Sequence, residues 1–90
     1  MTAVAERFAV RVMVTEVWDQ VTLAVDAATP VADLKRRALE QALQRPVRVD
    51  EYIVKFRGAQ VLDETIPLGA LGAGPNVPFI VLPARRQPVR

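Results

Sequence analysis

Hydrophobic and polar residues alternate in the first third of the chain. Between positions 8 and 15, the sequence FAVRVMVT places phenylalanine or valine at every even position. Between positions 21 and 26, VTLAVD places apolar residues at every odd position. Side chains of a strand alternate between its two faces, so this period of two predicts two strands that each bury one face. Residues 16–20 between them are enough for a hairpin loop.

The period then changes to that of a helix. Apolar residues recur at helical spacing between positions 31 and 45, and Pro46 ends the pattern. Thr29 followed by Pro30 predicts the start of the helix, because a threonine side chain caps free amides and the first turn accepts proline. Lys35 falls within the apolar arc. Either its stem packs while the ammonium reaches water, or the ammonium forms a semi-buried ion pair.

A further alternating run begins the sequence YIVKFRGAQVLD at positions 52–63. It predicts a strand that turns Ile53, Lys55 and Arg57 outward, followed by a turn around Gly58. The next residues mix glycine and proline with isolated apolar residues, which is typical of a loop with at most a short helical turn. Residues 77–82 predict the last strand.

These elements predict a single small α+β domain. Their order is strand, strand, helix, strand, short irregular strand, strand, and 90 residues suffice for one core. We expect a short N-terminal arm at residues 1–7, the folded domain at residues 8–83 and a basic, flexible tail at residues 84–90.

The composition argues against an enzyme. The chain contains no histidine, cysteine or serine, which removes the commonest nucleophiles, general bases and zinc ligands. The carboxylate pairs at positions 50–51 and 63–64 lack further oxygen ligands at suitable spacing, so they are poor metal sites. We therefore expect no catalytic residue, no metal and no cofactor.

The net charge of +2 is concentrated at one end of the chain. Without Arg85, Arg86 and Arg90 the remainder carries a net charge of −1, so we expect no specific binding of nucleic acid. A weaker hypothesis is that this tail tethers the protein to nucleic acid or to an anionic membrane. No apolar run is long enough to span a bilayer, and we expect a soluble, cytoplasmic protein.

Four segments together resemble ubiquitin-like β-grasp proteins. They are AVRVMVTEVWDQVTLAV, ATPVADLK, VKFRGAQVLD and TIPLGALGAGPNVPFIVL, and the resemblance covers about residues 8–83. It implies a mixed sheet of four to five strands packed on one main helix. It also implies that Lys35 is largely buried and forms a structural ion pair with Asp63, just after the turn of the third strand.

The resemblance further implies that a partner protein binds the outward face of the sheet. The predicted contact residues are Trp18, Arg11, Met13, Ile53, Lys55 and Arg57, together with either Phe79 and Val81 or Ile80 and Leu82. Ubiquitin has an isoleucine where this chain has Lys55, which argues against binding to ordinary ubiquitin receptors. Alternatively, Trp18 folds back over its own hairpin or under the tail, and Lys55 and Arg57 only solvate the sheet.

The chain ends PARRQPVR, with no glycine after Gly74. Ubiquitin and related sulfur carriers act through a terminal Gly-Gly, so the favoured function is a non-catalytic adaptor. The alternative is a modifier of a conjugation-like system that requires C-terminal processing or different C-terminal chemistry. Richness in alanine, valine and arginine is typical of GC-rich genomes and predicts a bacterial source. We expect a monomer that binds a protein partner.

Overall fold

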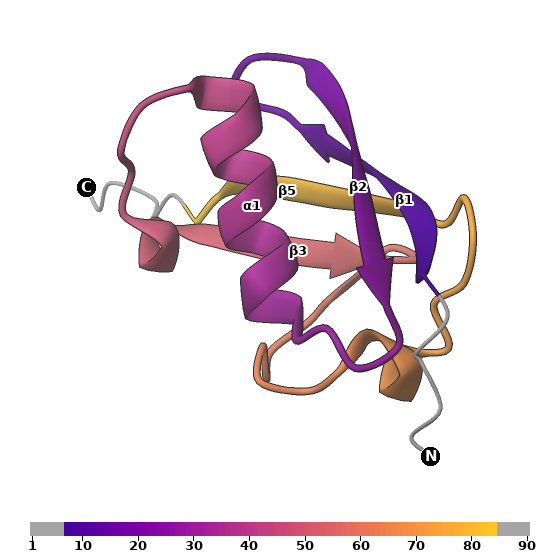
Figure 1. Ribbon diagram of the computed structural model, residues 1–90. Helices are drawn as coiled ribbons and strands as arrows, with labels where there is room; N and C mark the ends of the chain where they lie inside the picture. The colour runs from indigo at the N-terminus through magenta and orange to yellow at the C-terminus, as the bar shows by residue number, and fades with distance from the viewer. Residues whose placement is uncertain (1–6, 85–90) are drawn as a thin grey trace.

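One helix lies across one face of a five-stranded sheet in the computed structural model, which describes residues 7–84 (Figure 1). In chain order the elements are β1 (Arg7–Val14), β2 (Asp19–Asp26), α1 (Val31–Leu43), the 3-10 helix η1 (Val49–Glu51), β3 (Tyr52–Phe56), β4 (Ala59–Gln60), the 3-10 helix η2 (Leu68–Leu71) and β5 (Pro78–Pro83). This order confirms the predicted α+β domain with one main helix.

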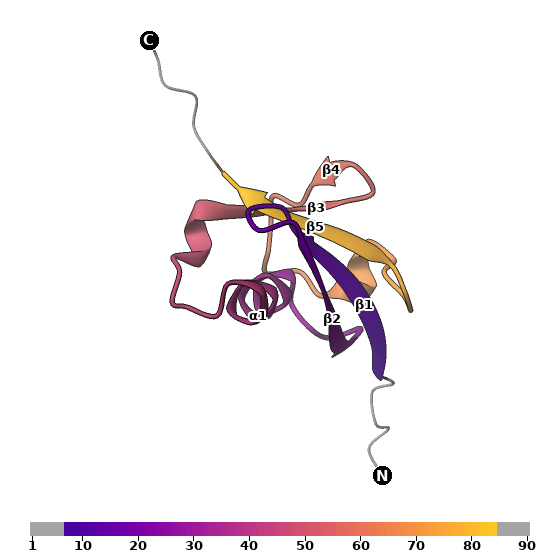
Figure 2. The same cartoon turned by 90° about the horizontal axis from the view of Figure 1, so that it is seen from above.

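The sheet is mixed, and its strand order is β2-β1-β5-β3-β4. Strands β1 and β5 run parallel, whereas the β1–β2, β3–β5 and β3–β4 pairs are antiparallel. Strand β5 therefore occupies the middle, although it is the last strand in sequence. In Figure 2, α1 lies on one side of the sheet and leaves the other side uncovered by any helix.

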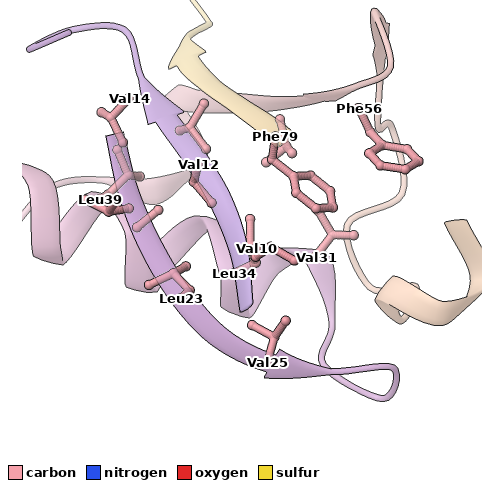
Figure 3. Packing of buried hydrophobic residues seen from close by; sticks show 14 of the residues in the cluster. Val10, Val12, Val14, Leu23, Val25, Val31, Leu34, Leu39, Phe56 and Phe79 are labelled. Atoms are coloured by element: carbon pink, nitrogen blue, oxygen red, sulfur yellow. The ribbon is translucent and has the colours of Figure 1, made fainter. Parts of the chain in front are cut away.

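The core fills the space between the sheet and α1 (Figure 3). Val10, Val12 and Val14 of β1 are all fully buried, which confirms the predicted alternation. Leu34 and Leu39 cover them from the helix. The rings of Phe56 and Phe79 are stacked with their centroids 4.9 Å apart, where β3 lies beside β5.

The start of α1 differs from the prediction that Thr29 caps it. Pro30 is the N-cap, and the Thr29 hydroxyl instead bonds to the backbone N–H and the carboxylate of Asp26. The free helix amides of Val31 and Ala32 donate to carbonyls of the loop before η2, at 3.0 and 2.8 Å. This loop therefore takes the capping role that was predicted for the threonine.

The other boundaries lie close to those predicted. Helix α1 ends at Leu43, because Gln44 adopts a left-handed conformation with φ 56°, two residues before Pro46. Strand β1 starts at Arg7 and η2 is the predicted short helical turn. Within residues 7–84, no helix combines the length and the apolar character needed to cross a membrane.

Candidate protein-binding surface

The outer face of the sheet combines alternate residues of β1, β5 and β3. Across the three strands, Met13 is opposite Ile80, and Ile80 is opposite Lys55. Ile53 is likewise opposite Leu82. The last strand therefore presents Ile80 and Leu82 on this face and buries Phe79 and Val81, which decides between the two alternatives.

One end of this face is basic. Arg11 is opposite Pro78 at the beginning of β5, and Lys55 and Arg57 come from the end of β3 beside it. Arg57 lies just past the strand, in the turn to β4, rather than within the strand as predicted. We call Arg7, Arg11, Lys55 and Arg57 the basic end.

The four residues of the basic end have no carboxylate within 4.0 Å in the part of the chain that the structure describes. Every other lysine or arginine in residues 7–84 forms such an ion pair; these are Lys35, Arg36, Arg37, Arg45 and Arg48. The unpaired positive charge is thus confined to strand β1 and to the end of β3. The tail residues Arg85, Arg86 and Arg90 lie outside the described residues.

The opposite end of the face is apolar. We call Met13, Ile53, Ile80 and Leu82, with Val17 and Trp18 of the hairpin loop, the apolar end. Trp18 is 78% exposed, so its ring does not fold back over the hairpin, and Val17 is 45% exposed. Aromatic side chains with this exposure are frequent anchors in protein interfaces.

Two of the predicted contact residues have a backbone conformation that bulky residues avoid. Trp18 has φ 52° and Arg57 has φ 55°. Arg57 and Gly58, at φ 83°, are the two loop residues between the paired Phe56 and Ala59, the arrangement of a type I′ turn. This turn prefers asparagine where Arg57 stands, because a left-handed conformation costs a larger side chain about 1 kcal/mol. The Arg57 guanidinium lies over the Phe56 ring, 5.0 Å from its centroid.

A polar cluster beneath the hairpin loop holds this loop against β3. The hydroxyl of Tyr52 donates a hydrogen bond to the carboxylate of Glu16, and Arg45 lies 3.8 Å from the same carboxylate. The bond to Glu16, followed by burial, raises the pKa of Tyr52. Glu16 precedes Trp18 by two residues, so the cluster fixes the base of the loop that carries the exposed tryptophan.

The buried lysine is paired with a different residue from the one predicted. Nζ of Lys35 lies 2.6 Å from Oε1 of Glu64 and donates to the backbone carbonyl of Tyr52 at 2.9 Å. Asp63 instead accepts hydrogen bonds from the backbone and the hydroxyl of Thr65 in an exposed turn, which lowers the pKa of its carboxyl. The predicted Lys35–Asp63 pair is therefore wrong by one residue, because Asp63 is engaged in this local turn.

Sequence reasoning missed several residues of the surface and its support. The sequence does not mark Glu16 or Val17 as part of the surface, or Glu64 as the partner of Lys35, since a carboxylate in a loop gives no signal of its partner. The alternation that turns Ile53 outward predicts that Tyr52 points into the core, where its ring is, but its hydroxyl reaches the hairpin loop. Coordinates are needed to tell which lysines and arginines have an ion-pair partner, so the basic end could not be found from the positions of these residues in the sequence.

Comparison with known proteins identifies the fold. No protein-family model and no curated protein matches the sequence. Among solved structures, a ubiquitin-like domain of Arabidopsis thaliana is 17% identical with a TM-score of 0.75, covering 99% of this chain and 89% of that one. Ubiquitin of Caldiarchaeum subterraneum is 13% identical with a TM-score of 0.74, covering 87% and 94%.

A third similar structure is the ubiquitin-like domain of Plasmodium falciparum Dsk2. It is 20% identical with a TM-score of 0.72, and the match covers 87% of this chain and 99% of that one. At these identities the similarity is one of architecture. Together with the five-stranded sheet and its single helix, it shows that this chain has the ubiquitin-like β-grasp fold.

Proposed function

We propose that the protein is a non-catalytic interaction module that binds a partner protein through the outer face of its sheet. The observation that carries this proposal is that the lysine and arginine side chains of residues 7–84 fall into two groups, one with ion-pair partners and one without. Those on α1 and in the loop after it form ion pairs within the domain, whereas the four of the basic end have no carboxylate partner in residues 7–84. Among the four, Arg11 donates to the neutral carbonyl of Asn76 at 3.3 Å. A partner that supplies carboxylates there gains attraction without breaking an existing ion pair.

The two ends of the face together define the chemistry of the partner. We expect it to present an apolar patch to the apolar end and acidic residues to the basic end. Lys55 stands between Ile80 on one side and Gln60 on the other, at the border of the two ends. The partner surface that we expect therefore changes from apolar to acidic where it meets Lys55, within the width of one strand.

The backbone of Trp18 and Arg57 supports the proposal. Unfavourable conformations persist where another requirement outweighs local stability, and binding sites are where they concentrate. Both residues are exposed, so neither conformation is enforced by burial of its side chain. The type I′ turn accounts for the φ of Arg57 but not for the choice of arginine there, and partner binding is a requirement that explains why these residue types occupy both positions.

Affinity purification from the source organism tests this function. The tagged protein is used as bait under native conditions, with Lys55→Glu and Trp18→Ala as variants. Arg48→Glu is the matched control, because it changes the charge equally at an exposed site in the loop after α1. We expect the two surface variants to lose an acidic partner that the control retains, with circular dichroism unchanged.

Two outcomes would contradict the proposal. Retention of every partner by both surface variants would exclude the outer face as the binding site. Adducts that survive denaturation and are linked through the C-terminus would instead favour the alternative, a protein modifier. The same purification, repeated in a denaturant, distinguishes the two functions.

A further inference from the structure

A second apolar surface lies at the β4 edge of the sheet, apart from the apolar end of the outer face. A groove of about 310 Å³ opens there between β4 and the loop that leads to η2. Its lining is mainly apolar and includes Phe56, Val61, Leu62, Ile66 and Leu71. Leu62 at its rim is 84% exposed, although leucine is normally buried.

The only protection of the β4 edge against strand pairing within residues 58–62 is the short length of β4, because this segment lacks the side chains that discourage such pairing. Edge strands commonly carry charged residues or proline, which discourage another strand from adding to them. Residues 58–62, GAQVL, include neither. At the opposite edge, Arg37 donates to the carbonyl of Ala24 at 2.9 Å, and Asp19 and Asp26 stand at the two ends of β2.

The two ends of the β4 segment carry opposite charges. Arg57 precedes it and Asp63 follows it, and neither forms an ion pair within residues 7–84. If two copies of this segment lie antiparallel, Arg57 of each copy faces Asp63 of the second copy. Leu62 and the groove likewise lie in one patch and complement each other. A two-fold symmetric interface requires such a self-complementary patch, because both copies use the same surface.

We propose that two copies of this chain associate through their β4 edges around a two-fold axis. Leu62 of each copy enters the groove of the other, and Arg57 of each pairs with Asp63 of the second copy. The edge is short, so the dimer is weak and exchanges rapidly with the monomer. This inference differs from the expected monomer. The dimer contact shares Arg57 with the proposed partner-binding face, whereas Leu62 and Asp63 belong to the dimer contact alone.

Sedimentation equilibrium of the full chain measures the association, at protein concentrations from roughly 10 μM to 1 mM, the range suited to a small interface. We expect Leu62→Asp to weaken the dimer by about tenfold or more, because each of two leucines loses its burial. Trp18→Ala, on the outer face, should leave it unchanged. A wild-type chain that stays monomeric throughout this range, or a dimer indifferent to Leu62→Asp, would overturn the proposal.

A charge exchange tests the pairing of the two edges. Arg57→Asp alone and Asp63→Arg alone each place like charges at both contacts, so each variant should be monomeric. An equimolar mixture of the two should form a heterodimer, because both contacts then join opposite charges. Thermal unfolding of each variant checks that its monomer is folded. Failure of the folded variants to associate on mixing, while the wild type dimerises, would show that the edges do not meet in this way.

Discussion

Nζ of Lys35 lies 2.6 Å from Oε1 of Glu64, and this ion pair joins helix α1 to the loop that caps it. The Lys35 side chain is 5% exposed and that of Glu64 is 22% exposed. The same ammonium donates to the carbonyl of Tyr52 at the start of β3. One buried charge thus connects the helix, a strand and a loop that are distant in sequence.

Removal of this lysine should destabilise the domain. Lys35→Met leaves the Glu64 carboxylate and the Tyr52 carbonyl without their donor, so we expect the free energy of unfolding to fall by about 3 kcal/mol. Glu64→Gln keeps a neutral acceptor and should cost less. Urea denaturation measures both losses, and Asp63→Asn is the control. A larger loss for Asp63→Asn than for Glu64→Gln would contradict the observed pairing.

The hydrogen bond from Tyr52 to Glu16 should be visible in alkaline solution. Because this bond and burial raise the pKa of Tyr52 above its ordinary 10.0, the stabilisation is complete below that pH and is lost as the pH rises through the pKa of the folded state. Tyr52→Phe should lower the free energy of unfolding by about 1 to 2 kcal/mol at neutral pH. The difference between wild type and variant, measured by denaturation from pH 7 to 11, should shrink above pH 10. A difference that stays constant over that range would argue against the bond.

Gly69 should not tolerate a side chain. A Cβ at this position would lie 3.0 Å from the Cβ of Ala27 and 3.2 Å from its carbonyl oxygen, which already accepts the Gly69 N–H. Gly69→Ala should therefore cost about 1 to 2 kcal/mol through overpacking. Gly74→Ala is the matched control, because a Cβ there meets no atom within 4 Å. Thermal unfolding of the two variants compares them, and equal transition temperatures would show that η2 shifts freely.

Arg57→Asn should separate stability from binding. Asparagine suits the first position of a type I′ turn before glycine, so we expect the free energy of unfolding to rise by up to about 1 kcal/mol. The loss of the guanidinium should weaken both partner binding and self-association. Chemical denaturation and the purification assay provide the two measurements. A variant that is more stable and binds equally well would show that Arg57 does not contribute to the binding surface.

The regular part of the fold was predictable because its pattern is strong. Valines at positions 10, 12 and 14 lie on one face only in a strand, and all three are buried. The N-terminus of α1 was not predictable in the same way. The Thr29 and Pro30 signal located the helix start correctly but assigned the cap to the wrong group, because the carbonyls that accept the helix amides come from more than 30 residues later.

The candidate site was predictable in part, for a related reason. Alternation placed Ile53 and Lys55 on the outer face, but it could not orient the last strand until the register of β5 between β1 and β3 was known. The resemblance predicted the buried lysine correctly and its partner wrongly. In a loop without a repeating pattern, a shift of one residue exchanges Asp63 for Glu64, and only coordinates reveal it.

The position of β5 has a consequence for the order of events during translation. Strands β1 and β3 emerge from the ribosome well before β5, yet each has one edge without its sheet neighbour until β5 is inserted between them. The nascent domain must therefore wait, with two strand edges open, until residue 83 has been made. Its folding depends on the release of this segment from the ribosomal tunnel, and a ribosome stalled before that point exposes an unfinished sheet to the cell's chaperones.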